Sequence, residues 1–208
     1  LSRRPRAPTH PVAACGCVSG TRSGVYRMCL AGLHAASRQE PALSGVGIDS
    51  WAVDSALLRG DRRVSNPAHY RDDRTGSCVA ATHALIAPAD IYAYNGLQFL
   101  PFNTLYQLSA DRLAGDLEVA ESMLLIPDLL TYWLTGQKVA ERTNSPTTRL
   151  LDIRTGAWDP TRTPHRGLPR PHLPPPRAPP TPVRPPPPPI PPPPGPAPGP
   201  LVRPPGLR

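Results

Sequence analysis

Residues 45–54 carry the side chains with the clearest chemical potential in this chain of 208 residues. Val46 and Ile48 predict a short buried strand. The end of that strand and the turn after it carry two acids, a hydroxyl and an indole: Asp49, Ser50, Trp51 and Asp54. Ligands of open α/β sheets bind outside the carboxyl ends of the strands. Carboxylates accept hydrogen bonds from hydroxyls, and an aromatic face covers the C–H side of a sugar ring. The stretch therefore favours a site for a polyhydroxylated ligand, and the alternative is a core strand with two solvated acids.

Two further segments add candidate ligand contacts. Residues 70–75 are a dense cluster of opposite charges, in which Arg71 or Arg74 offers a forked donor to hydroxyls or phosphate. A solvated loop of weak salt bridges is the alternative. Residues 96–104 form an extended segment in which the amides of Gln98 and Asn103 stand among aromatic residues.

Alternating helices and strands must position these groups, which predicts an α/β fold. Apolar spacing predicts a helix over 25–38 before the first strand. A second strand at 56–58, a polar turn at 59–63 and a return strand at 64–70, broken or placed at an edge by Pro67, predict a hairpin. Further helices are expected at 77–86, from 88, at 105–117 and at 129–134, with Asn103 or Thr104 as the cap of the helix over 105–117. One further strand is expected at 123–128.

The charge of the chain is divided among three regions. Residues 1–44 carry a net +5, residues 45–159 a net −4, and residues 160–208 a net +7, so the overall +8 belongs to the flanks. The middle of the chain is mildly acidic, and we do not expect nucleic-acid binding. No run approaches the roughly 20 apolar residues that span a bilayer, and no secretory signal follows the N-terminal arginines. We therefore expect no membrane partner and a cytoplasmic protein.

The cysteines do not predict a metal site. Three of the four, Cys15, Cys17 and Cys29, lie in the irregular N-terminal part, and Cys78 stands alone. A C-x-C pair without a histidine cluster or a second pair is a poor zinc signal. The absence of a disulfide framework fits a reducing compartment.

The flanks are expected to be disordered. Residues 1–24 lack periodicity, and 24 of the 33 prolines fall after residue 159, where helix and sheet are disfavoured and polyproline II is favoured. The C-terminal segment could be an SH3 or WW ligand or a spacer. Its restriction mainly to Pro, Arg, Gly, Ala and Leu is also typical of GC-rich DNA read out of frame, which favours a frameshift or misplaced gene ends.

The middle of the chain contains five distinctive motifs: GIDSWAVD at 47–54, HYRDDRT at 69–75, GLQFLPFNTLYQL at 96–108, LIPDLLTYWLTG at 125–136 and TNSPTT at 143–148. In their sequence and order these motifs resemble the rhamnulokinases of the FGGY carbohydrate kinases. They cover about residues 45–159, with weaker similarity back to Val25. The resemblance implies an incomplete actin-like (ribonuclease H-like) ATPase domain over 25–159, with flanks at 1–24 and 160–208.

The resemblance also implies a function. Family members phosphorylate a sugar with ATP and Mg²⁺, here an L-rhamnulose-like ketose at its terminal hydroxyl. Carried over by motif, Trp51, Ala52 and Val53 line the sugar site, mainly through the backbone at Ala52. Asp54 and Arg71, and then Gln98 and Asn103, are the next expected contacts. Ala52 stands where the family often has glycine, and Ser55 where it has an aromatic residue.

No catalytic residue is assigned. Phosphoryl transfer needs a base for the attacking hydroxyl, a phosphate cradle and held Mg²⁺. The resemblance places the phosphate loop before Gly45 and the general base and nucleotide domain after Asp159, where this chain has unrelated sequence. Neither Asp49, Asp54 nor Asp128 fills the base role. We therefore expect an inactive kinase fragment, with a non-catalytic sugar-binding protein or a Pro-rich interaction protein as the alternatives.

Overall fold

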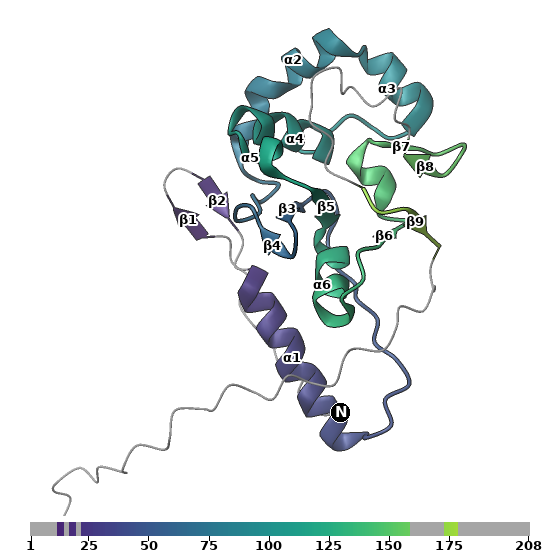
Figure 1. The fold of residues 1–208 in the computed structure, drawn as a ribbon. Helices are drawn as coiled ribbons and strands as arrows, with labels where there is room; N and C mark the ends of the chain where they lie inside the picture. Colours follow the sequence, from purple (N-terminus) through teal and green to yellow (C-terminus); the bar gives the residue numbers. More distant parts are fainter. Residues whose placement is uncertain (1–11, 15–16, 20–21, 159–172, 179–208) are drawn as a thin grey trace, which may run out of the picture.

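The computed structural model describes residues 12–14, 17–19, 22–158 and 173–178, with side chains from Gly24 onward (Figure 1). The helices are α1 (Arg22–Gln39), α2 (Gly76–Leu85), α3 (Pro88–Asn95), α4 (Thr104–Leu113), α5 (Asp116–Val119) and α6 (Ile126–Thr135), with 3-10 turns η1 (Asp73–Thr75) and η2 (Ser145–Thr148). The strands are β1 (Val12–Ala14), β2 (Cys17–Ser19), β3 (Ser55–Arg59), β4 (Arg62–Arg63), β5 (Ser122–Leu125), β6 (Ala140–Glu141), β7 (Leu151–Asp152), β8 (Ala157–Trp158) and β9 (Pro176–Arg177).

The core is built on a three-stranded sheet in the order β4-β3-β5. β3 and β5 pair antiparallel from Ser55 opposite Leu125 to Leu58 opposite Ser122. The ladder continues past the strand ends, since the N–H of Ile126 donates to the carbonyl of Asp54 at 3.1 Å. Residues 54 and 126 are therefore held side by side.

Side chains alternate between two apolar clusters because successive residues of a strand face opposite sides of a sheet. Leu57 and Met123 belong to a cluster that includes Ile91, Tyr94 and Leu105. Ala56, Leu58 and Leu124 belong to a second cluster that is formed largely by α6. Figure 1 accordingly shows α2 to α5 on one side of the sheet and α6 and α1 on the other.

Most of the expected helices are present, and α1 has an identified docking partner. The Tyr26 hydroxyl donates to the carbonyl of Trp133 at 2.9 Å, and the two rings pack edge to face at 5.1 Å. α6 ends at Thr135, as predicted, and Gly136 after it has a left-handed conformation with φ 72°. Glycine adopts this conformation without a Cβ penalty.

The strand predicted within 45–54 is wrong. These residues form no strand, and Val46 is 56% exposed. A strand requires a partner for its backbone groups, and none of the described segments pairs with this stretch. Ile48 instead packs against the α6 cluster.

The hairpin turn is confirmed, but its return strand is shorter than expected. Leu58 pairs with Arg63 and Arg59 with Arg62, around a two-residue turn at Gly60 and Asp61. The predicted strand over 64–70 is wrong: after Val64 the chain leaves the sheet, consistent with the break expected at Pro67.

Both flanks contain strands, which corrects the expectation that they are disordered throughout. β1 and β2 pair as an antiparallel hairpin, and β9 pairs in parallel with β6. Proline cannot donate to a ladder, but the carbonyl of Arg177 accepts from the N–H of Arg142 at 2.9 Å. The indole of Trp158 also donates to the carbonyl of Pro174 at 2.6 Å. The rest of the proline-rich segment, with its SH3 or WW hypothesis, lies outside the described residues.

Candidate functional site

The predicted ligand stretch ends in a tight turn that leads into β3. The N–H of Asp54 donates to the carbonyl of Ala52 at 2.8 Å, and Val53 between them has a φ of 64°. A hydrogen bond between the first and third residues of a three-residue turn, with a positive φ at the middle residue, defines the rarer and strained form of the γ-turn. A β-branched residue with positive φ is an outlier that costs about 1–3 kcal/mol, so surrounding contacts must hold it in place.

Two side chains of α4 hold this turn. The Thr104 hydroxyl donates to the carbonyl of Val53 at 2.7 Å, and the Gln107 amide donates to the same oxygen at 3.2 Å. Both side chains are buried. A carbonyl oxygen has two lone pairs, so these two donors satisfy it. Gln107 also donates to the carbonyl of Phe102 at 2.9 Å, which joins the turn to the start of α4.

Trp51 and Asp54 contact each other directly. The indole N–H donates to Oδ2 of Asp54 at 2.8 Å, and Asp54 is fully buried whereas Trp51 is partly exposed. The carboxylate of Asp54 therefore orients the indole. Of the predicted contacts, Trp51, Ala52, Val53 and Asp54 come together as one unit.

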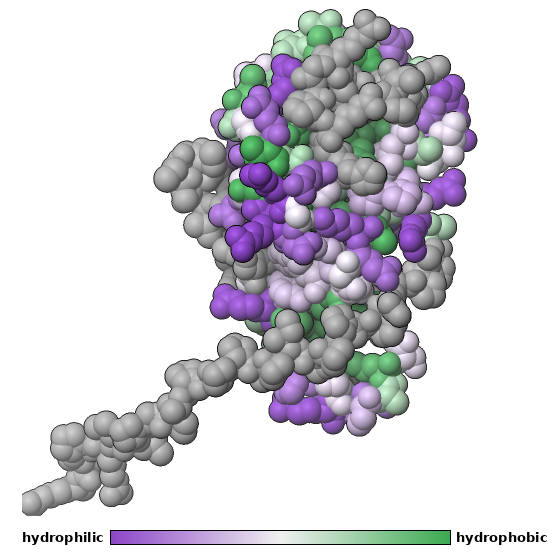
Figure 2. Space-filling view, viewed as in Figure 1, coloured by the Kyte–Doolittle hydropathy of each residue, from purple (hydrophilic) through white to green (hydrophobic). Residues whose placement is uncertain are grey.

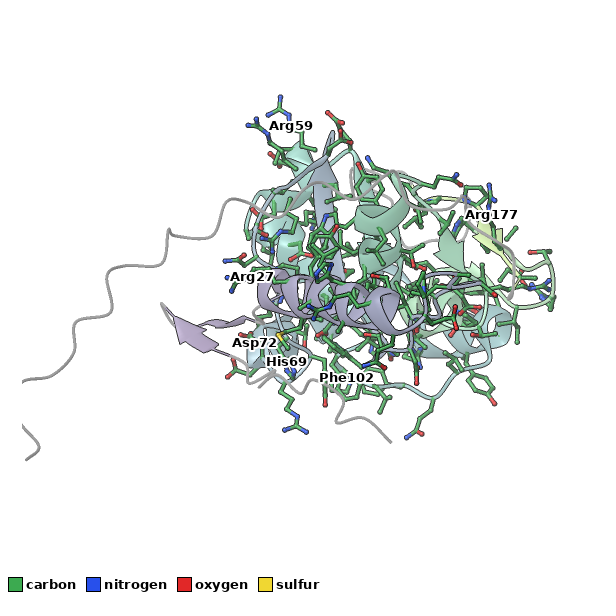
Figure 3. The ribbon with its side chains drawn as sticks, turned by 90° about the horizontal axis from the view of Figure 1, so that it is seen from below. Arg27, Arg59, His69, Asp72, Phe102 and Arg177 are labelled. Carbon is green, nitrogen blue, oxygen red and sulfur yellow. The ribbon has the colours of Figure 1, made fainter. Side chains whose placement is uncertain are left out.

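Arg71 lies on the surface, in a loop of stacked aromatic groups. His69 stacks on Tyr70 at 4.5 Å, Tyr70 packs against Phe102 at 5.6 Å, and the Arg71 guanidinium lies over the Tyr70 ring at 5.6 Å. Figure 3 shows His69, Asp72 and Phe102 near one edge of the molecule, well away from Arg59 and Arg177. This loop meets the candidate site through Phe102, which precedes α4.

Arg74 links the same loop to α4. Its guanidinium forms an ion pair with Asp111 and contacts Oε1 of Gln107 at 3.4 Å. Burial raises the pKa of Asp111, and the charge of Arg74 opposes that shift. Arg74 thus touches a side chain that holds the Val53 turn, which Arg71 does not.

The two predicted amides differ in their environment. Gln98 is exposed and forms no hydrogen bond with other described residues. Asn103 is buried: its oxygen accepts from the N–H of Leu100 and from Nε of Arg149, and its Nδ2 donates to the carbonyl of Thr147. The side chain of Asn103 therefore joins segments of the protein and is not directed at the Trp51 turn.

Arg149 is a buried cation that sequence patterns did not identify. It is 2% exposed, has a left-handed φ of 62°, and donates to Asn103 at 2.9 Å and to the carbonyl of Leu97 at 2.7 Å. Burial lowers its pKa. The roles of Arg149, Thr104 and Gln107 follow only from tertiary contacts, although all three lie in or directly beside the five motifs that carry the resemblance.

Among the described Asp and Glu residues, Asp128 has the carboxyl whose pKa is raised most. Burial raises the pKa of its carboxyl to about 7; a backbone hydrogen bond from the N–H of Glu141, at 3.1 Å, opposes the shift, and the Glu141 charge adds to it. Asp128 stands in the first turn of α6 and fastens the segment around Glu141. The hydrogen bond from Glu141 therefore gives the buried carboxyl of Asp128 a structural role.

Comparison with known proteins places this architecture among sugar kinases. The profile of the FGGY family of carbohydrate kinases, N-terminal domain, matches residues 25–178. Rhamnulokinase from Pectobacterium atrosepticum is 44% identical over 147 residues, which are 69% of this chain and 30% of that protein. Rhamnulokinase from Yersinia pestis bv. Antiqua (strain Angola) is also 44% identical, over 66% of this chain and 29% of its own length.

Solved structures share the fold. Ligand-bound xylulose kinase from Lactobacillus acidophilus superposes with a TM-score of 0.71 at 16% identity, over 82% of this chain and 36% of its own. Xylulose kinase from Rhodospirillum rubrum gives 0.70 at 17% identity, over 85% and 40%.

The fold is thus that of an actin-like (ribonuclease H-like) sugar-kinase domain. The chain belongs to the FGGY family of carbohydrate kinases and matches its N-terminal domain. The match extends to residue 178, beyond the expected boundary at 159, and so includes β9. The chain spans about 30% of the length of the curated relatives it matches.

Proposed function

We propose that this protein is the sugar-binding portion of a carbohydrate kinase whose substrate is L-rhamnulose or a closely similar ketose. The observation that supports this most strongly is the Trp51–Asp54 unit, a strained turn with an oriented indole and a buried carboxylate, within a region 44% identical to rhamnulokinases. The indole face suits the C–H side of the sugar, and the backbone at Ala52 suits its hydroxyls. Arg71 and Gln98 are exposed donors and are proposed as more distant contacts, whereas the buried amide of Asn103 is engaged by Leu100, Thr147 and Arg149.

Phosphoryl transfer from ATP is proposed for the family's whole protein and not for these residues alone. Among the described residues, no three His, Cys, Asp or Glu side chains gather to hold a metal ion. Transfer of a phosphoryl group depends on positioning and charge stabilisation. We therefore propose that the 208-residue chain binds the ketose without phosphorylating it.

The setting of this function is proposed to be a reducing cytosol. Cys29 and Cys78 are free thiols, which fits such a compartment. Within the described part of the chain, no helix is long and apolar enough to cross a membrane.

Calorimetry on the purified 208-residue chain tests the binding proposal. L-rhamnulose is expected to bind measurably, whereas the isomeric aldose L-rhamnose is expected to bind more weakly. Trp51→Ala is expected to abolish most of the heat, and Trp158→Phe, remote in sequence, serves as the tryptophan control. Equal binding by both tryptophan variants would contradict the proposal.

A coupled assay for ADP tests the catalytic half. With ATP, Mg²⁺ and L-rhamnulose, no sugar-dependent ADP release is expected from this chain. Turnover that depends on the sugar would overturn the assignment of the chain as binding without phosphorylation.

A further inference from the structure

The carbonyl of Val53 receives more support than an ordinary turn. It accepts from Thr104 at 2.7 Å and from Gln107 at 3.2 Å, and both donors are buried on α4, at its first residue and one turn further on. Strain of the Val53 kind persists only where the surroundings over-determine the conformation. These two hydrogen bonds are such surroundings, because they fix the plane of the peptide between Val53 and Asp54.

One of these two donors, Gln107, also connects the turn to the surface loop. Gln107 bonds the carbonyls of Val53 and Phe102 through its Nε2, and its Oε1 lies 3.4 Å from the Arg74 guanidinium. Arg74 in turn pairs with Asp111, one turn further along α4. The buried amide of Gln107 thus contacts both the Val53 turn beside Trp51 and Arg74, which lies in the same loop as Arg71.

We propose that Thr104 and Gln107 are positioning residues that set the direction of the Val53–Asp54 peptide, whose N–H holds the carbonyl of Ala52, and thereby set the affinity for the sugar. They do not touch the ligand themselves; they act through the Val53 carbonyl. This inference rests on the proposed function, because it assigns a cause to the affinity of the same site.

Thr104→Val is the sharpest variant, since it replaces a hydroxyl by a methyl group of similar shape. Gln107 still satisfies the Val53 carbonyl, so the fold is expected to persist. Two measurements are made on the full chain: hydrogen exchange of the Asp54 amide without ligand, and the Kd for L-rhamnulose by calorimetry. The Asp54 amide is the donor of the γ-turn, so its exchange reports the turn directly.

Thr104→Val is expected to speed exchange at Asp54 and to weaken L-rhamnulose binding about tenfold, the size of effect that the loss of one buried hydrogen bond produces. Thr104→Ser keeps the hydroxyl and is expected to restore both values. The matched control is Thr82→Val, because Thr82 is also buried and donates to the carbonyl of Cys78 at 2.8 Å. It should alter neither measurement, even if it lowers the melting temperature.

The outcomes separate the two claims. If the parent chain binds L-rhamnulose and Thr104→Val binds it equally well, the positioning role is overturned while the proposed function stands. If Thr82→Val weakens binding as much as Thr104→Val, the effect is general destabilisation and the positioning role is also overturned. If the parent chain binds no L-rhamnulose, both claims fail, whatever the exchange at Asp54 shows.

Discussion

Single residues in this domain carry free-energy costs that their neighbours offset. Val53 holds a positive φ because Thr104 and Gln107 bond its carbonyl. Asp128 is buried near a second carboxylate, and one backbone donor partly offsets that burial. The strain at Val53 lies in the candidate site, whereas the burial of the Asp128 carboxyl arises from the packing of α6.

Asp128 gives stability a pH dependence of a definite sign. Its pKa is about 7 in the folded protein, against an ordinary value of 3.8. Between these values the folded state holds a proton that the unfolded state has lost, so the free energy of unfolding falls as pH rises from about 4 to about 7. Asp128→Asn removes this penalty and is expected to add roughly 2–4 kcal/mol at pH 8 and little near pH 4, since one pKa unit is worth about 1.4 kcal/mol.

Denaturant unfolding at pH 4, 6 and 8 measures this effect. Asp152→Asn is the control of opposite sign: hydrogen bonds from the Arg154 side chain and backbone lower the pKa of Asp152 to about 2. Its stabilisation is present above the ordinary pKa and is lost as pH falls toward 2, so this substitution should destabilise the protein at pH 6 and 8. A gain for Asp128→Asn that is the same at all three pH values would contradict the assignment.

The types of the site residues were readable from the sequence, but their geometry was not. Trp51 and Asp54 stand three residues apart on a turn, and a direct contact between an indole and a carboxylate there requires no distant part of the chain. Asn103 was expected to face the ligand, yet it lies among Leu100, Thr147 and Arg149. Its partners are up to 46 residues away, and no local pattern encodes such contacts.

At the level of elements, helices were predictable where the chain itself supplies their ends. α3 begins at Pro88, and α6 ends before Gly136, both local signals. Strands were less predictable because a strand depends on its partner. Residues 45–54 have strand-like composition but no strand partner among the described residues, whereas β9 has a proline in it and pairs with β6 through the carbonyl of Arg177.

Helix α1 packs against the α6 cluster through Val25 and Tyr26, and Tyr26 adds a hydrogen bond. Tyr26 bonds the carbonyl of Trp133 and packs on its ring, and burial raises the pKa of the Tyr26 hydroxyl. Tyr26→Ala is expected to lower the free energy of unfolding by about 2–3 kcal/mol, less than for a fully buried aromatic side chain, and to release α1. Trypsin should then cut faster at Arg27 and Arg38 within the helix. Tyr92→Ala, at a residue 60% exposed, should leave the cleavage rate unchanged.

For the molecule as a whole, the exposed large apolar side chains of the described residues are spread over several elements, and three of the nine lie in one segment before β3. Leu30, Leu43 and Val46 are 42–56% exposed, and all three lie on α1 or on the connection from α1 to β3. Figure 2 shows apolar residues among polar ones at the lower end of the molecule, where Figure 1 places the end of α1. Exposed apolar surface of this kind promotes association of partly covered domains.

We therefore expect the chain to self-associate through this segment at concentrations of about 10 to 100 µM. Leu43→Glu with Val46→Glu should shift the mass measured by light scattering toward the 22.4 kDa of one chain, because carboxylates resist burial between copies. Tyr92→Glu with Leu113→Glu introduces the same two charges at residues 60% and 72% exposed on α3 and α4. That control should leave the mass unchanged. It shows whether the position of the two added charges matters or only their number. A monomeric parent chain, or an equal effect of both pairs, would show that the segment between α1 and β3 is not the contact.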